Sequence, residues 1–358
     1  MKRILMTTGM VALSTQLAYA GGIDRSGQST SILYEDGNYA EFSLGVVDGS
    51  VSGTAVGQAS GDVAETYTQL AAGYKWSYGG NWDLAVTFDQ PYGADINYDA
   101  ATTYPLRGTT ATFDSTAFTV LGKYNFDGGF SLHGGVKSQS IEMEVGLPAA
   151  GYSAAGAREN GFGYVIGGAY ERPEIALRVA LSYHSAIDYS VGTTENGAAS
   201  LNTDITTPQA INLDVQSGIA ADTLLFGSLR WVEWSAFDIT PAGFAAANGG
   251  ASLVSYADDT ITGSIGIGRK LSDQWSVAAT YTYEGSGGGF QSNLGPTDGR
   301  SAFGLGGTYT NGDMKVTFGG QYILPGDAQT IVSATGPITS DFTDNSALAF
   351  GVKVGFSM

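Results

Sequence analysis

The most constraining feature of this chain is a repeated alternation of apolar and polar residues after residue 38. The alternation recurs in about fourteen short segments, and the breaks between them are in turn tight and long. Strands of a transmembrane β-barrel turn one face to lipid and the other to the lumen, and their connections alternate in length in the same way. The sequence therefore predicts an all-β fold, a closed antiparallel transmembrane barrel over residues 39–358.

The last segment shows the alternation most clearly. One face carries Leu348, Phe350, Val352, Val354 and Phe356, while the residues between them are small or polar. Aromatic residues stand next to the tight turns in several segments, as in the interfacial girdles of membrane barrels. Aromatic pairing in a soluble sheet is the alternative, but the alternating connection lengths favour a membrane barrel.

The connections also orient the barrel. Tight turns are expected near 79–81, 127–129, 171–174, 220–223, 272–274 and 311–313. Long connections are expected near 49–63, 98–112, 147–160, 187–205, 238–254, 285–300 and 325–343. Strict alternation requires an even number of strands, so we expect both termini in the periplasm and the long loops outside a Gram-negative outer membrane.

The N-terminal residues predict export. Lys2 and Arg3 precede an apolar run that ends in Ala18, Tyr19 and Ala20, which fits a signal peptide over residues 1–20. No later stretch approaches the ~20 apolar residues of a spanning helix. Residues 21–38 then form a short segment before the first strand, and its Ser26–Ser29 stretch reads as flexible and polar.

Composition excludes several classes of function. The chain has no cysteine, two histidines (His133 and His184) and a formal net charge of −18. Thiolate metal sites and disulfides are excluded, and neither histidine has a recognisable nucleophile beside it. An acidic chain of this kind is a poor partner for nucleic acid. We therefore expect no enzyme activity, no cofactor, no metal and no nucleic-acid partner.

Basic residues occupy polar-face positions of the expected strands and should point into the lumen. They are Lys75, Lys123, Lys137, Arg178 and Lys353. A charge in a poorly solvated pore needs a partner, which a ligand carboxylate could provide. The alternative is that Asp83, Asp89 or Asp214 neutralises them as part of the packing. Arg230 and Glu233 cannot share a face of a strand without a bulge, so which of the two points into the lumen stays open.

The chain resembles the FadL/TodX family of outer-membrane transporters over most of its length. The best local match runs from Pro208 to Phe237 and includes a W-x-x-W-S-x-F pattern that begins at Trp231, and a second match runs from Trp82 to Gly93. The resemblance implies a fourteen-stranded barrel, a hatch in the lumen, a kinked third strand that opens the wall, and uptake of long-chain fatty acids or other hydrophobic compounds. The hatch is usually longer and carries an Asn-Pro-Ala-type motif that is absent here, so residues 21–38 are expected to form a reduced plug.

The third strand can also be interpreted without the family. Pro91 cannot donate a ladder hydrogen bond and Gly93 has no side chain to pack, although both stand where the alternation should continue. We expect either a kink with a lateral opening or a simple strand end at the interface.

Two outer connections, 147–157 and 239–251, are apolar, and Leu147 and Phe244 are candidates for a first capture site. The leading function is passive, substrate-specific uptake of hydrophobic molecules, with long-chain fatty acids as the leading ligand and lateral release through the wall. A general porin for polar solutes and a non-transporting, adhesin-like surface barrel are the alternatives. We expect a monomer surrounded by outer-membrane lipid and lipopolysaccharide.

Overall fold

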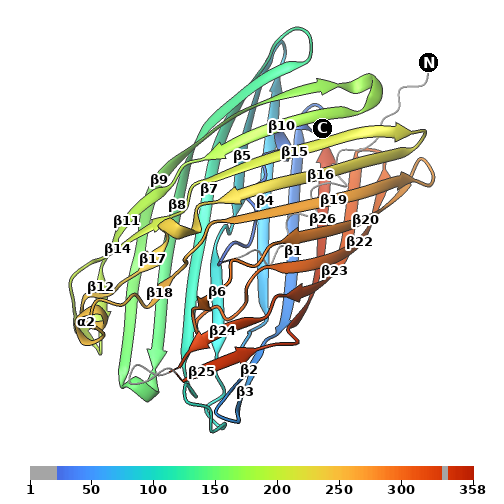
Figure 1. The fold of residues 1–358 in the computed structure, drawn as a ribbon. Coiled ribbons are helices and arrows are strands. Elements are labelled where there is room, and N and C mark those ends of the chain that lie inside the picture. The colour runs from blue at the N-terminus through green and yellow to red at the C-terminus, as the bar shows by residue number, and fades with distance from the viewer. Residues whose placement is uncertain (1–21, 333–337) are drawn as a thin grey trace.

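The computed structural model describes residues 22–332 and 338–358, so the predicted signal peptide lies outside the described residues. It forms a closed antiparallel barrel of fourteen strands, as the sequence predicted (Figure 1). The strands are β1 (Tyr39–Ser50), β4 (Tyr67–Tyr78), β5 (Trp82–Asp89) continued by β6 (Gly93–Asn97), β7 (Thr110–Asn125), β8 (Phe130–Leu147), β9 (Tyr152–Arg172), β10 (Leu177–His184), β15 (Ala210–Ala220), β16 (Thr223–Val232), β19 (Thr260–Lys270), β20 (Trp275–Glu284), β22 (Arg300–Asn311), β23 (Met314–Pro325) and β26 (Ser346–Ser357). Strand β1 pairs with both β4 and β26, which closes the barrel.

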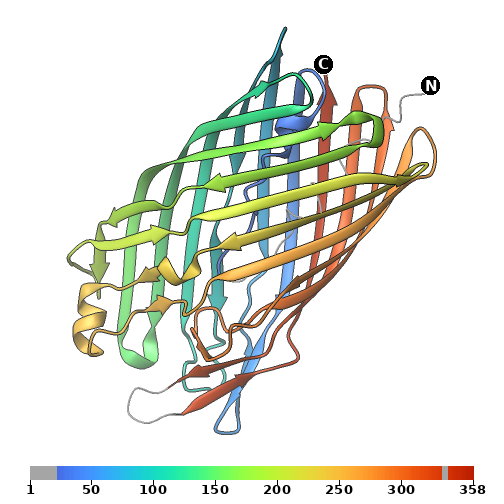
Figure 2. The same cartoon turned by 45° about the horizontal axis from the view of Figure 1, so that its top comes forward.

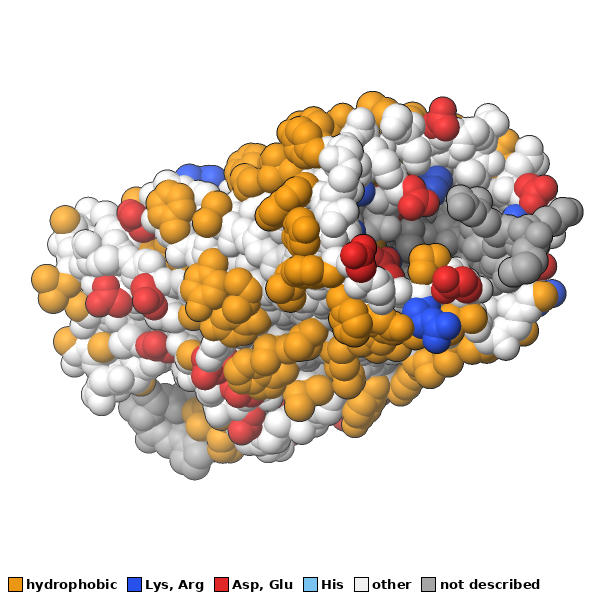
Figure 3. Space-filling model, turned by 90° about the horizontal axis from the view of Figure 1, so that it is seen from above, with side chains coloured by type: hydrophobic (Ala, Val, Ile, Leu, Met, Phe, Trp, Pro, Cys, Tyr) orange, Lys and Arg blue, Asp and Glu red, His pale blue; other side chains and the backbone are white. Residues whose placement is uncertain are grey.

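The two faces of the wall follow the alternation. In β26, Phe350 is 61% exposed on the outer surface, whereas Ala349 and Lys353 on the inner face are buried. Hydrophobic side chains gather in a broad band across the middle of the molecule, and charged side chains lie mainly toward its ends (Figure 3). This arrangement suits a barrel whose outer face contacts hydrocarbon.

Short turns and long loops lie at opposite ends of the barrel, and the C-terminus lies at the end with the short turns (Figures 1 and 2). The loop end carries additional elements. They are a five-stranded sheet of β2 (Ser52–Ala55), β3 (Gln58–Asp62), β21 (Phe290–Gln291), β24 (Ala328–Ile331) and β25 (Thr339–Phe342); the strands β11 (Ile187–Val191), β12 (Thr193–Glu195), β13 (Ala198–Ala199), β14 (Thr203–Thr207), β17 (Asp238–Ile239) and β18 (Val254–Ser255); and helix α2 (Ala242–Ala247). No helix among the described residues has the length and apolar character needed to cross a bilayer.

One expected loop is wrong. Residues 147–160 were expected to form a long connection, but β8 and β9 continue as a hairpin joined only by a 3-10 turn, η3 (Pro148–Ala150), and Gly151. Gly151 adopts φ +60°, a backbone conformation that closes a tight turn at little cost when no Cβ is present. The apolar residues of this region are therefore strand residues that extend the wall outward.

The N-terminal segment lies inside the barrel. Its 3-10 helix η2 (Ser31–Tyr34) buries Ile32, Leu33 and Tyr34. They form one cluster with small and aliphatic residues of the wall, among them Ala85 and Leu121. The stretch from Ser26 to Ser29, which the sequence suggested was flexible, includes buried residues such as Ser26 and Gln28. We call residues 22–38 the hatch.

Candidate functional site

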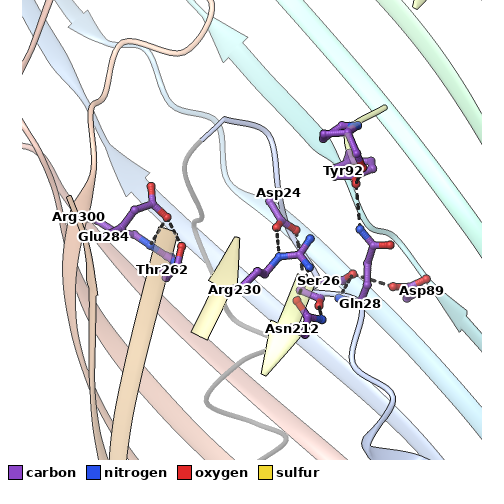
Figure 4. A network of polar contacts seen from close by, with 12 residues as sticks. Asp24, Ser26, Gln28, Asp89, Tyr92, Asn212, Arg230, Thr262, Glu284 and Arg300 are labelled. Atoms are coloured by element: carbon purple, nitrogen blue, oxygen red, sulfur yellow. Dashed lines mark hydrogen bonds and ion pairs between the residues drawn. The ribbon is translucent and has the colours of Figure 1, made fainter. Parts of the chain in front are cut away.

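Polar contacts fix one side of the hatch to the wall formed by β15 and β16 (Figure 4). Arg230 Nε lies 2.6 Å from Asp24 Oδ2, and Arg230 Nη1 donates to Asn212 Oδ1 at 2.7 Å. Asn212 Nδ2 in turn donates to the Gly27 carbonyl at 2.9 Å. The question left open for Arg230 is thereby answered, since its side chain points into the lumen.

The other side of the hatch is tied to the third strand and to β8. Ser26 Oγ donates to Asp89 Oδ2 at 2.7 Å, and Gln28 Nε2 donates to the Tyr92 hydroxyl at 2.9 Å (Figure 4). Lys137 donates to Gln28 Oε1 from the neighbouring wall. A segment of only seventeen residues, 22–38, is thus held across the lumen because its polar groups find partners on opposite walls.

Three of the five predicted lumenal bases are paired with the protein's own acids. Lys75 and Lys123 lie 3.2 and 3.4 Å from the two carboxylate oxygens of Asp83. Lys353 lies 3.3 Å from Glu41. Lys75 also donates to the carbonyl oxygen of Glu35 in the hatch at 2.6 Å. Lys75 therefore helps to position the hatch, and all three lysines neutralise acids of the wall, which is the packing role expected as the alternative, although the partner of Lys353 is Glu41 and not one of the three acids named there.

Lys137 and Arg178 differ from these three lysines. In the described part of the chain, neither has a carboxylate oxygen within 4.0 Å. The Arg178 guanidinium lies 4.8 Å from the centre of the Tyr34 ring, and its buried Nη1 has no hydrogen-bond partner there. Of the predicted bases, these two form no ion pair with a carboxylate of the described residues, and a role in ligand binding stays a prediction for them.

The third strand is interrupted at Gln90–Tyr92, next to Pro91 and Gly93. Asp89 pairs with Ala117 of β7, but Gly93 pairs with Asp114. The third strand therefore advances by four residues where β7 advances by three. The extra residue is a β-bulge, which bends a strand and locally ends its pairing.

A gap in the wall follows from this bulge. The ladder between β4 and the third strand ends at the pair Ala72–Phe88, and pairing resumes only where Glu65 N donates to the Asp95 carbonyl at 3.2 Å. We call the stretch between these two points, 66–71 on one side and 89–94 on the other, the window. Across it, Leu70 N donates to the side-chain Oε1 of Gln90 at 2.8 Å in place of a ladder bond.

An apolar pocket lies beside the window on the loop side of the hatch. It encloses about 490 Å³, part of it open to solvent, and its lining includes Ile23, Ala94, Phe113, Phe237 and Ile239. Its lining joins an aromatic cluster in which Trp234 and Phe237 are 0% and 1% exposed with ring centres 5.7 Å apart. The W-x-x-W-S-x-F pattern therefore places its second Trp and its Phe next to this pocket.

The predicted capture residues lie at the loop end, but both are half-buried. Leu147 packs against the cluster under the five-stranded sheet, and the Phe244 ring lies 5.2 Å from that of Tyr152. Glu195 anchors helix α2 by accepting from the backbone N–H groups of Gly243 and Phe244 at 2.8 and 2.9 Å. Burial favours a higher pKa for Glu195, but hydrogen bonds from Ser200, Tyr152 and this helix outweigh it and lower the pKa to about 2.

Asp24, Arg25 and Arg230 take part in the site although the sequence did not predict them there. Asp24 and Arg25 are adjacent charges within a short segment that was predicted to be flexible. No local sequence pattern identifies the wall residues that pair with them. Within residues 22–332 and 338–358, no group of three or more His, Cys, Asp or Glu side chains is arranged to hold a metal ion.

Comparison with known proteins identifies the family that shares this architecture. A family model described as outer membrane protein transport protein (OMPP1/FadL/TodX) matches residues 47–357. The chain belongs to the OMPP1/FadL/TodX family. The members of this family are outer-membrane β-barrel proteins that form transport channels for hydrophobic compounds. No curated protein sequence matches the chain.

Solved structures agree with the family at the level of fold. A FadL homologue of Pseudomonas aeruginosa superposes with a TM-score of 0.77 at 13% identity, over 97% of this chain and 98% of the other. The toluene transporter TodX of Pseudomonas putida gives 0.69 at 12% identity, over 97% and 98%. The toluene transporter TbuX of Ralstonia pickettii gives 0.63 at 12% identity, over 90% of both chains.

Proposed function

We propose that this protein takes up hydrophobic molecules passively and releases them sideways, from the lumen through the window into the outer membrane. The observation that carries the proposal is the break in the ladder between Ala72–Phe88 and Glu65–Asp95. A complete ladder leaves no passage through a barrel wall, because every backbone group is paired with the neighbouring strand.

The position of the apolar pocket supports lateral release. Ile23 and Ala94 line both this pocket and a second, more polar one at the window, which has a volume of about 560 Å³. Toward the short turns the hatch crosses the lumen, and the cavity beside it is lined by polar groups such as Ser26, Gln28 and Lys137. Burial of apolar surface contributes roughly 25 cal/mol per Å² of favourable free energy. A hydrophobic ligand is therefore stabilised by moving into the bilayer and destabilised by passing the polar groups of the hatch.

Long-chain fatty acids are the ligands that we propose first, with Lys137 or Arg178 as contacts for the carboxylate. Aromatic hydrocarbons are the second candidate, since TodX and TbuX, which share this fold, are toluene transporters. The apolar pocket has no basic side chain in its lining, which suits an uncharged ligand equally well.

The route is tested by filling the window. A Cβ on Gly93 would lie 2.4 Å from Arg25 Nη1, so a large side chain there must occupy the window itself. We expect Gly93→Phe to reduce uptake of a long-chain fatty acid and of toluene into cells several-fold. Gly79→Phe is the matched control, because a Cβ on Gly79 meets nothing within 4 Å.

Folding of each variant is checked by electrophoresis, in which a folded barrel and the heat-unfolded chain differ in mobility. Unchanged uptake by a folded Gly93→Phe barrel would exclude the window as the route. Uptake of neither ligand by the wild type would exclude the proposed transport function itself.

A further inference from the structure

We infer that the Arg25 side chain is the latch of the window, so that one segment closes both the lumen and the wall. This inference rests on the proposed lateral route. Arg25 is 9% exposed and extends from the hatch into the stretch of wall where β4 and the third strand do not pair. None of the family features described above assigns it a role.

The guanidinium joins the two sides of the window. The Arg25 Nη2 atom lies 2.6 Å from Asp95 Oδ2 on β6. The guanidinium carbon Cζ lies 3.8 Å from the centre of the Tyr67 ring on β4. A planar guanidinium can stack on an aromatic face while its in-plane N–H groups bind a carboxylate, which an ammonium group cannot do. Arg25 therefore bridges the two strands with a side chain where the backbone does not.

Gly93 provides the space for this side chain. A Cβ at position 93 would lie 2.4 to 2.7 Å from three atoms of the guanidinium group. Any side chain at position 93 would displace Arg25 from Tyr67 and Asp95, and a large one such as Phe would itself fill the space that Arg25 leaves. The glycine expected to weaken the strand therefore also seats the latch.

The backbone of the hatch completes the closure. Arg25 N donates to the Pro91 carbonyl at 2.8 Å, and Gly93 N donates to the Ile23 carbonyl at 2.9 Å. Tyr92, between them, instead uses its backbone N–H and carbonyl to bind Ser115 Oγ of β7. Alternate residues of a strand bond to opposite sides, so the hatch occupies the edge of the third strand that faces β4.

A ligand has a direct connection to this latch. Ile23 lines the apolar pocket and is two residues from Arg25 in the same short backbone pairing. Displacement of Ile23 by a ligand would strain the pairing with Pro91 and Gly93. The free energy of ligand binding can therefore offset the cost of breaking the contacts that close the window.

The latch is tested with a single reporter thiol. The chain has no cysteine, so Thr30→Cys introduces a unique thiol at a buried position of the hatch, five residues from Arg25. The rate of its reaction with a water-soluble maleimide measures hatch release. We expect Arg25→Ala and Asp95→Asn to raise this rate by about tenfold or more. Arg25→Lys should raise the labelling rate less, because lysine keeps the positive charge but lacks the planar guanidinium that stacks on Tyr67.

Arg158→Ala is the matched control. It also removes an arginine–carboxylate pair, 2.9 Å long, but on the exposed surface of β8 and β9, and this pair contacts neither the hatch nor β4. We expect it to leave the labelling rate unchanged. Equal labelling rates in the wild type, Arg25→Ala and Asp95→Asn would overturn the latch.

Uptake provides a second measurement that separates this inference from the proposed function. Arg25→Ala should increase uptake of a long-chain fatty acid or toluene several-fold, and adding Gly93→Phe should reverse the increase. Faster labelling together with no uptake in any variant supports the latch and rejects transport. Uptake by the wild type with no change in Arg25→Ala rejects the latch and leaves transport in place.

Discussion

Removal of the Asp24 carboxylate should release the hatch from the far wall. Asp24 and Arg230 are 2.6 Å apart, and their side chains are 1% and 11% exposed, so solvent screens this ion pair little. Deleting one partner of a buried pair leaves the other charge uncompensated and typically costs 3–5 kcal/mol. Arg230 keeps its hydrogen bond to Asn212, so we expect about 2–4 kcal/mol for Asp24→Ala.

This loss should appear as hatch release rather than barrel unfolding, because the strand ladders do not depend on the pair. When it is measured by maleimide labelling of the buried Thr30→Cys, a destabilisation of this size accelerates labelling by roughly 30- to 1000-fold if closure of the hatch is faster than labelling. The double variant Asp24→Ala/Arg230→Met removes both charges and should label much more slowly than Asp24→Ala alone. An unchanged rate in Asp24→Ala, or equal rates in the single and double variants, would refute the buried-pair argument.

Two further predictions concern the lipid face and the loop end. Phe350→Arg places a charge near the middle of the outer face and should destabilise the barrel by about 2–4 kcal/mol in urea unfolding, while Phe356→Arg at the strand end should cost about 0–1 kcal/mol. A similar cost at both positions would contradict the membrane orientation. The pKa of Glu195 is depressed to about 2, so its stabilisation of helix α2 should be complete above the ordinary carboxyl pKa and fade as pH falls toward 2. Glu195→Gln should therefore increase proteolytic cleavage of this loop at neutral pH, and the difference from the wild type should disappear near pH 2.

The barrel was predictable from sequence because its information is local. Period-2 alternation, as in Leu348 to Phe356, fixes which side of each strand faces lipid, and the order of short and long breaks fixes the topology. Pro91 lacks a donor whatever surrounds it, so the interruption of the third strand could also be placed. The loop expected over 147–160 failed, because small and apolar residues suit a strand that extends beyond the membrane as well as a loop.

The function of the inward-facing charges was decided only by tertiary structure. Lys75 and Lys123 could be assigned to the lumen from alternation, but their shared partner Asp83 depends on strand register and their contact with the hatch depends on how residues 22–38 cross the barrel. Arg25 and Asp95 are 70 positions apart, and no periodicity links them. A strand pattern specifies the direction of a side chain, whereas an ion pair across the lumen requires the closed wall that brings distant segments together.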